Sequence, residues 1–151
     1  MAYTGSAING YIVIDGAFLA VPNSKEATEL SKELMQLSKH LQNHPLTLEI
    51  SDGRIEHFFT KDEELYRAFG KLTLFDSYKI ITEVGISFNE ACKEFINDWP
   101  AASNEGRPGV HIGIGGDPDP NSETNVPLVH LDMMAMTSSI SINGYSFLVT
   151  I

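Results

Sequence analysis

Three Asp-Gly or Asn-Gly pairs divide apolar-rich segments of the chain. Asp15-Gly16 separates residues 11–14 from 17–21, Asp52-Gly53 separates 46–51 from 54–59, and Asn143-Gly144 separates 139–142 from 145–151. Such pairs favour two-residue turns with positive φ and are the strongest short-range signal for a β-hairpin. The pattern therefore predicts three antiparallel hairpins.

The position of each turn also fixes which side chains share a face, because side chains alternate along a strand. In the last hairpin, Ile140, Ile142, Tyr145 and Phe147 fall on one face and serines on the other. This division predicts one buried and one solvated face. The first hairpin is apolar on both faces, so we expect it to lie centrally in a sheet or under a helix.

The middle hairpin gives a specific prediction for one histidine. Counting from the turn places His57 and Phe59 on the apolar face with Leu46, Leu48 and Ile50. The other face carries Thr47, Glu49, Arg54, Glu56 and Phe58. The alternation therefore predicts that His57 is a core histidine.

The longest helical pattern covers residues 24–43. Its apolar residues recur at spacings of three and four, which makes one apolar stripe. They are Ala27, Leu30, Leu34, Leu37 and Leu41. Asn23 or Ser24 can cap its start, and Pro45 ends it. The stripe predicts a long helix that packs on the sheet.

Two further helices are indicated by capping-box spacing. Ser87 and Glu90 have this spacing at the start of a predicted helix over residues 88–98, which carries an apolar stripe. Thr60 and Glu63 have it at the start of a shorter predicted helix over residues 60–69 that Gly70 ends. Cys92, the single cysteine, lies on the 88–98 stripe and is interpreted as a small core residue. Residues 72–75 and 78–84 are predicted strands.

Together these elements predict one α+β domain over residues 1–151. It consists mainly of antiparallel hairpins, with two long helices and one short helix packed on the sheet. The length is typical of one domain, and the hydrophobic fraction of 42% is sufficient for a core. A single cysteine excludes an internal disulfide. No signal-peptide pattern or long apolar run is present, so a soluble cytoplasmic protein is expected.

The net charge is −10, with 20 acidic residues against 10 Lys and Arg. Nucleic-acid binding and docking on anionic lipid both call for basic surfaces, so neither is expected. From Pro108 to the last residue there is no Lys or Arg, while Asp117, Asp119, Glu123 and Asp132 remain. Acidity of this kind serves solubility, or it attracts a basic partner protein or a cation.

One pair of segments offers residues for chemistry. Residues 109–116 form an alternating strand with His111 on its polar side, and residues 128–136 carry His130 and Asp132 in the same way. If the two strands pair antiparallel, matching their apolar rows puts His111 opposite His130, opposite Asp132, or one step beyond. Two imidazoles and a carboxylate then share a face beside Gly113. They are candidates for acid/base catalysis or for binding zinc or another transition metal.

The loop at residues 116–123 is a second candidate site. Asp117, Asp119, Asn121 and Glu123 place oxygen atoms at alternate positions, as in calcium-binding loops. The loop departs from the EF-hand pattern because it lacks glycine at the sixth position and carries Leu128 at the twelfth. Its prolines also stiffen it, which favours a solvated loop.

Three functions remain open from the sequence. The first is a small acidic binding protein, such as an inhibitor or immunity-type factor that masks a basic partner. The second is a hydrolase or metal-dependent enzyme that uses His111, His130 and Asp132. The third is a self-associating subunit that pairs through edge strands. No motif identifies a cofactor.

Overall fold

The computed structural model describes residues 8–22, 25, 27–87, 108–115, 129–136, 138–142 and 145–149, with the backbone alone for the last two ranges. The described elements are β1 Gly10–Ile14, β2 Phe18–Pro22, α1 Thr28–Leu41, β3 Leu46–Ser51, β4 Arg54–Phe59, α2 Glu63–Leu72, β5 Ile81–Ser87, β6 Gly109–Ile114, β7 Val129–Ala135, β8 Ser138–Ile142 and β9 Tyr145–Val149. A short 3-10 helix, Asp76–Tyr78, precedes β5. The predicted α+β class is confirmed.

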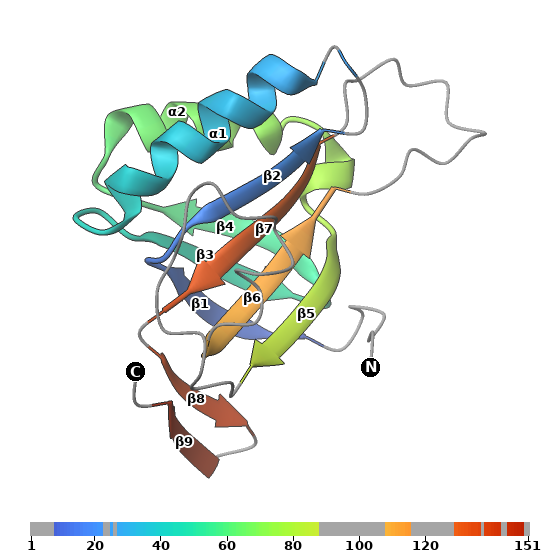
Figure 1. Ribbon diagram of the computed structural model, residues 1–151. Coiled ribbons are helices and arrows are strands. Elements are labelled where there is room, and N and C mark those ends of the chain that lie inside the picture. The colour runs from blue at the N-terminus through green and yellow to red at the C-terminus, as the bar shows by residue number, and fades with distance from the viewer. Residues whose placement is uncertain are drawn as a thin grey trace.

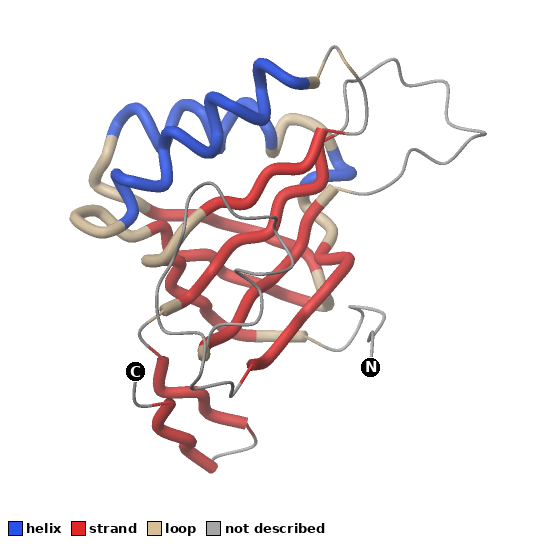
Figure 2. Tube along the Cα trace, viewed as in Figure 1, coloured by secondary structure: helices blue, strands red, loops and turns tan. Residues whose placement is uncertain are grey.

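The described strands form two main antiparallel sheets and a separate hairpin. Their orders are β1-β3-β4, β2-β7-β6-β5 and β8-β9. One hydrophobic core joins the two main sheets and includes Ile14, Leu48, Ile112 and Leu131. Both helices lie along the same side of the molecule (Figure 1), and the strands of the two sheets run in different directions (Figure 2). Each main sheet therefore has an inner face and an outer face.

The first predicted hairpin is wrong. β1 pairs with β3 and β2 pairs with β7, so Asp15-Gly16 forms a corner between two sheets. At this corner the Gly16 N–H donates to the Met134 carbonyl at 2.9 Å, and Asp15 Oδ1 accepts from the Met136 N–H at 2.6 Å. The Asp15-Gly16 corner is thus held by the end of β7 and not by pairing between the two strands that flank it. Neither strand is central in the described sheets, but helix α1 packs along β2, as the second alternative predicts for that strand.

The middle hairpin is confirmed at its turn but not along its length. Asp52 and Gly53 both have positive φ, as a two-residue type I′ turn requires. Ile50 pairs with Ile55, and Glu49 then pairs with His57 because a β-bulge accommodates Glu56. The extra residue reverses the faces beyond it. The predicted core position of His57 is therefore wrong, since the side chain is exposed.

The bulge also exchanges the roles of two phenylalanines. Phe58 lies opposite Leu48 and contacts Phe69 of α2, with ring centroids 5.1 Å apart. Phe59 points outward and is 55% exposed. With Tyr11, which is 70% exposed, and Val13, it forms the exposed apolar part of the outer face of the β1-β3-β4 sheet.

Helix α1 packs along the outer edge of β2 through its buried face. Its N-cap is Ala27, not Asn23 or Ser24, and Leu34, Leu37 and Leu41 are buried as the stripe predicts. Two buried serines reach the edge of β2. Ser38 Oγ accepts from the Phe18 N–H at 2.9 Å, and Ser31 Oγ donates to the Ala20 carbonyl at 2.7 Å. These bonds satisfy strand groups that an open edge would leave available for pairing.

Helix α2 differs at both ends from the prediction. Its N-cap is Asp62, whose Oδ1 accepts from the Leu65 N–H at 2.8 Å, so Thr60 does not form the predicted capping box. The helix continues through Gly70 and ends at Leu72. The predicted strand over residues 72–75 is therefore wrong, and the next strand begins at Ile81.

The last hairpin has the predicted two-residue register, with Ile140 opposite Phe147 and Ile142 opposite Tyr145. The predicted helix over residues 88–98, with Cys92, lies outside the described residues, as does the loop with Asp117, Asp119, Asn121 and Glu123.

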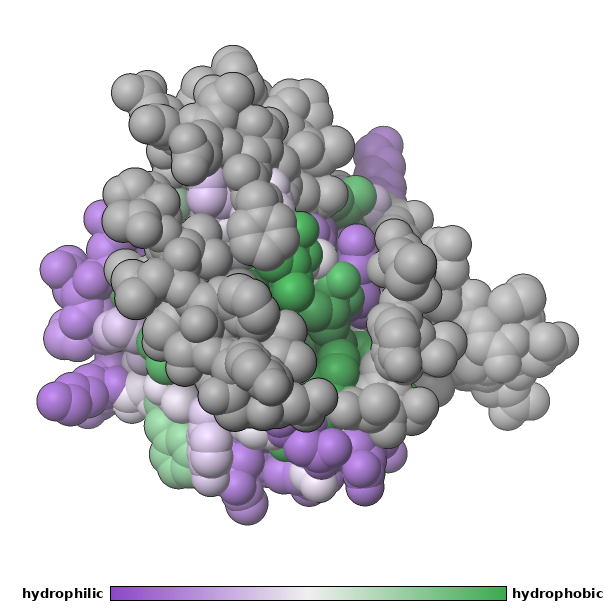
Figure 3. All heavy atoms as spheres, turned by 90° about the horizontal axis from the view of Figure 1, so that it is seen from below, coloured by the Kyte–Doolittle hydropathy of each residue, from purple (hydrophilic) through white to green (hydrophobic). Residues whose placement is uncertain are grey.

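Among the described helices, none has the length and apolarity to cross a membrane. Seen from below, the described surface is polar toward the periphery and apolar nearer the centre (Figure 3).

Candidate functional site

The outer face of the β2-β7-β6-β5 sheet carries the predicted polar residues. β6 and β7 pair antiparallel, with Gly113 opposite Asp132 and His111 opposite Met134. Matching the apolar rows allows three registers. The structure has the third of them, in which His111 lies opposite the residue one step beyond Asp132, Met134. His111, His130 and Asp132 therefore share the face that points away from the main core. Both His111 and Asp132 are buried there, at 7% and 2% exposure.

Glu83 of β5 is the fourth member of this group, and sequence reasoning missed it. It lies opposite Gly113 of β6, and Gly85 lies opposite His111. A β-bulge between Ile81 and Glu83 reverses the alternation, so Glu83 does not share the inner face with Ile81. The alternation of polar and apolar residues from Glu83 to Ser87 is the sequence feature that could have placed Glu83 on this face. It identifies Glu83 only when β5 is known to border β6.

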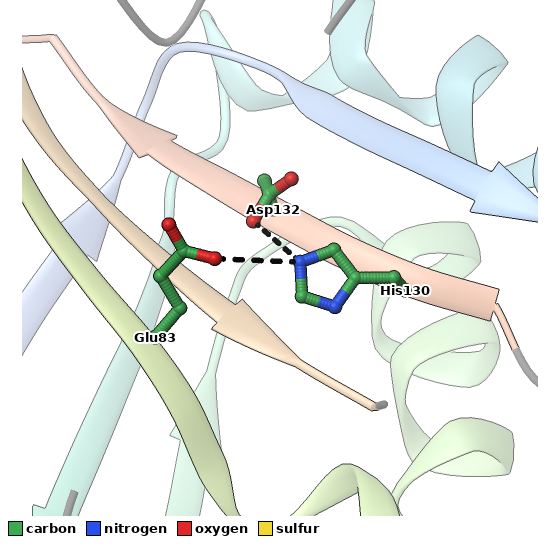
Figure 4. Close-up of side chains that lie close together, drawn as sticks. All are labelled: Glu83, His130 and Asp132. Carbon is green, nitrogen blue, oxygen red and sulfur yellow. Dashed lines mark hydrogen bonds and ion pairs between the residues drawn. The ribbon is translucent and has the colours of Figure 1, made fainter. Parts of the chain in front are cut away.

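The side chains of Glu83, His130 and Asp132 converge from two strands (Figure 4). His130 Nε2 lies 3.1 Å from Asp132 Oδ1 and 3.9 Å from Glu83 Oε2. The other Glu83 oxygen, Oε1, lies 3.5 Å from His111 Nε2. Glu83 thus stands between the two imidazoles, while His130 and Asp132 are in direct contact. We call these four residues the polar cluster.

Two glycines make room for the polar cluster on the sheet. A Cβ atom at Gly113 would lie 3.0 Å from Asp132 Oδ1, 3.1 Å from Glu83 Cβ and 3.1 Å from His130 Cε1. A Cβ atom at Gly85 would collide with the His111 ring. The space beside Gly113, where the sequence suggested room for a ligand, is therefore taken up by three side chains of the cluster.

The orientation of His130 is fixed through its second ring nitrogen. Nδ1 lies 2.9 Å from the Gly115 carbonyl, which can only accept, so Nδ1 carries a proton and donates it. Nε2 is consequently the nitrogen that faces the two carboxylates. The hydrogen bond to Asp132 raises the pKa of His130 to about 9; burial opposes this, and Gly115 and Glu83 add to it. Near neutral pH the ring is therefore an imidazolium.

Tyr78 fixes the start of the strand that carries His130. Its buried hydroxyl oxygen accepts from the Val129 N–H at 2.8 Å. Burial raises the pKa of Tyr78 above its ordinary value, so the hydroxyl stays protonated at physiological pH. Gly115, with φ +69°, has no space for a Cβ because the Val129 carbonyl and the Tyr78 ring are too close. These contacts hold Gly115 and His130 in register.

The geometry is suited to binding a metal ion. Glu83, His130 and Asp132 each offer a ligand atom, and the three atoms all lie within 4.8 Å of one another. Ligand atoms about 2.1 Å from a shared ion lie about 3.0–3.4 Å apart at octahedral or tetrahedral angles. The distances at His130 Nε2 are 3.1 and 3.9 Å, and all three atoms lie within 4.8 Å of one another, so the site must contract to hold an ion. His111 reaches this trio through Glu83.

The chain matches the model of a protein family. The family described as "Crocagin biosynthetic protein CgnE/B" matches residues 3–121. That range contains Glu83 and His111 but ends before His130 and Asp132, so the match covers half of the polar cluster. No curated protein matches the chain.

A solved structure shares the fold. It is that of 2,5-dihydroxypyridine dioxygenase from Pseudomonas putida KT2440, with a TM-score of 0.51 and 13% sequence identity. The similarity covers 87% of this chain and 36% of that enzyme. At this identity the likeness concerns the fold alone. The chain spans little more than a third of the length of the enzyme that it resembles.

Proposed function

The chain belongs to the family of crocagin biosynthetic proteins CgnE/B, and on that premise we propose that it binds a divalent transition-metal ion through Glu83, His130 and Asp132. The convergence of these three ligand atoms on one sheet face is the observation that carries the proposal. The ion would supply Lewis-acid or redox chemistry to a biosynthetic step, and the chain would supply its ligands.

The hydrogen bonding of His130 supports a ligand role. A histidine that binds a metal commonly donates its other ring N–H to a carbonyl or carboxylate, which fixes its tautomer and orientation. His130 Nδ1 donates to the Gly115 carbonyl in this way and directs Nε2 at Asp132 and Glu83. In the metal-free protein, the proton on Nε2 occupies the position that a metal ion would take.

The donor atoms favour particular metals. One imidazole nitrogen with two carboxylate oxygens suits first-row ions such as Fe(II), Mn(II) and Zn(II) better than Ca²⁺, which prefers six to eight oxygens. The solved structure with the same fold is named a dioxygenase. That name makes oxygen-dependent chemistry the first reaction class to test for this chain.

Metal titration tests the proposal directly. Protein freed of metal by a chelator is titrated with Co²⁺, followed by visible absorption, and the bound metal is counted by elemental analysis. We expect one ion per chain, and we expect Asp132→Asn and His130→Gln each to weaken binding by about tenfold to a hundredfold or more. His57→Gln, which changes an exposed histidine on β4, serves as the control. Absence of stoichiometric binding, or an equal loss in the control, overturns the proposal.

The acidity of the chain favours a second candidate, a binding protein that covers a basic partner. The net charge of −10 is its supporting observation. Neither the family nor the solved structure is named for an inhibitor or immunity role, so this function stays a prediction. It requires association that weakens steeply as salt is added. Failure to recover a partner in low-salt pull-downs would reject it.

A further inference from the structure

The three candidate ligands differ in how strongly the surrounding protein constrains their side chains. Asp132 and His130 lie on β7, which is bordered by β2 and β6, and the Asp132 side chain is 4% exposed. Glu83 lies on β5, the outer strand of the described sheet, next to a bulge, and its side chain is 47% exposed. Its two ion-pair distances, 3.5 and 3.9 Å, exceed those of good hydrogen bonds. Glu83 is therefore the ligand that can move at least cost.

Glu83 also has a second partner available. Its Oε1 faces His111 Nε2 at 3.5 Å, on the side away from His130. The His111 ring is buried against the bare backbone of Gly85, where a Cβ would collide with it. His111 is consequently fixed in place, and a small rotation of the Glu83 carboxylate brings it closer to one imidazole or the other.

The charges of the site restrict what can bind there. Glu83 and Asp132 together balance the charge of a divalent ion, and their ion pairs in the described part of the chain are with imidazoles. An additional anion on the ion would leave uncompensated negative charge in a chain whose net charge is already −10. An anion that replaces Glu83 on the ion keeps the charge of the metal centre unchanged.

From these observations we propose that Glu83 is the exchangeable ligand of the metal site, displaced by an anionic oxygen-donor ligand and received by His111. The inference rests on the proposed metal binding. In the exchange, the metal–oxygen bond to Glu83 breaks, and bonds to one or two oxygens of the incoming carboxylate or hydroxy-carboxylate form. The carboxylate of Glu83 stays ionised and accepts a hydrogen bond from His111. His111 is thus a positioning residue that acts through Glu83.

Glycolate is a suitable probe, because it is a monoanion near neutral pH and offers two oxygens to a metal. The Co²⁺-loaded protein is titrated with glycolate, and the change in visible absorption gives the dissociation constant. If Glu83 is bound to the ion about 90% of the time, glycolate can bind only to the remaining fraction of about 10%, and its apparent affinity is about tenfold lower than its intrinsic affinity. Removing Glu83 removes this competition and strengthens glycolate binding about tenfold. We therefore expect Glu83→Ala to retain Co²⁺ and to bind glycolate about tenfold more tightly than the wild type.

The His111 variants separate positioning from packing. His111→Ala leaves the displaced Glu83 without a partner, so we expect glycolate to bind about threefold to tenfold more weakly at full Co²⁺ loading. His111→Gln retains an N–H donor and is expected to restore most of the affinity. Glu49→Ala, on the outer face of the other sheet, is the control and should leave glycolate binding unchanged.

The outcomes distinguish this inference from the proposal on which it rests. If the wild type binds no Co²⁺, metal binding and ligand exchange both fail. If the wild type binds Co²⁺ but Glu83→Ala either loses Co²⁺ or binds glycolate no more tightly than the wild type, the exchange alone is overturned. Equal affinities in His111→Ala and His111→Gln overturn the role of His111.

Discussion

The two main sheets of this protein use their outer faces in opposite ways. On the β1-β3-β4 sheet, the outward side chains include Tyr11, at 70% exposure, and Phe59, and the Tyr11–Glu49 hydrogen bond of 2.9 Å is open to solvent. On the β2-β7-β6-β5 sheet, the outward side chains include Asp132 and His111, which are buried and paired. Two buried polar side chains therefore lie on the second face, and large exposed apolar side chains lie on the first.

This inversion indicates which face is specialised. Scattered exposed apolar side chains are normal on a folded protein, whereas buried charged groups are rare and must be paired. Burying the polar cluster also requires glycine at position 85, where a Cβ would collide with the His111 ring, and leaves only a tight fit for a Cβ at position 113. The outer face of the four-stranded sheet therefore carries a structural cost that the other face does not, which is typical of a functional site.

The largest expected difference between the two faces comes from removing one acid on each. Asp132→Ala deprives the His130 imidazolium of its buried partner, so we expect it to reduce the free energy of unfolding by about 3 kcal/mol. Glu49→Ala removes an exposed hydrogen bond to Tyr11 and should cost about 0.5 kcal/mol or less. Urea denaturation of the two variants measures both values. Similar losses would mean that the burial of the cluster does not distinguish the faces.

A second pair of variants tests the β-bulge that decides which residues reach the exposed face. Phe58→Ala removes a ring that packs against Phe69 and Tyr66, so we expect a loss of about 2–3 kcal/mol in the free energy of unfolding. Phe59→Ala removes an outward ring and should cost less than about 1 kcal/mol. Thermal and urea unfolding check the order, and a larger loss for Phe59→Ala would contradict the register of β4.

These two phenylalanines also show what could be predicted from the sequence and what could not. The turn at Asp52-Gly53 was readable because it depends on local conformational preferences at two residues. The bulge at Glu56 was not readable, because it depends on how Phe58 packs against a helix that follows later in the chain. One extra residue was enough to place His57 on the wrong face.

The polar cluster also has one part that could be predicted from the sequence and one part that could not. The alternation along β6 and β7 was sufficient to put His111, His130 and Asp132 on one face once pairing was assumed. Glu83 was out of reach because a second bulge reverses β5 after Ile81, and nothing local identifies β5 as the neighbour of β6. The separation of β1 from β2 was equally hidden, since the Asp15-Gly16 corner resembles a hairpin turn and differs only in its distant partners.

The smallest expected effect is a dependence of stability on pH that belongs to the polar face alone. The pKa of His130 is raised from 6.5 in the unfolded chain to about 9 in the folded protein, mainly by its bond to Asp132. Between these values the folded state binds more protons than the unfolded state, so stability falls as pH rises. The contribution of His130 is fully present below pH 6.5 and is lost as pH passes 9. Partial exposure of the ring to solvent limits its size.

Denaturation of metal-free protein across this range, compared with His130→Gln, isolates the effect. The wild type should lose stability relative to His130→Gln between pH 6.5 and 9, and His57→Gln, on the exposed face, should follow the wild type throughout. A parallel pH dependence in wild type and His130→Gln would show that the imidazolium is not stabilised by its carboxylates. Metal binding should have the opposite trend, with apparent affinity rising toward pH 9, because the ion must displace the Nε2 proton. Opposite slopes for stability and metal affinity would therefore both report on one atom, Nε2 of His130, which lies beside the Asp132 and Glu83 carboxylates.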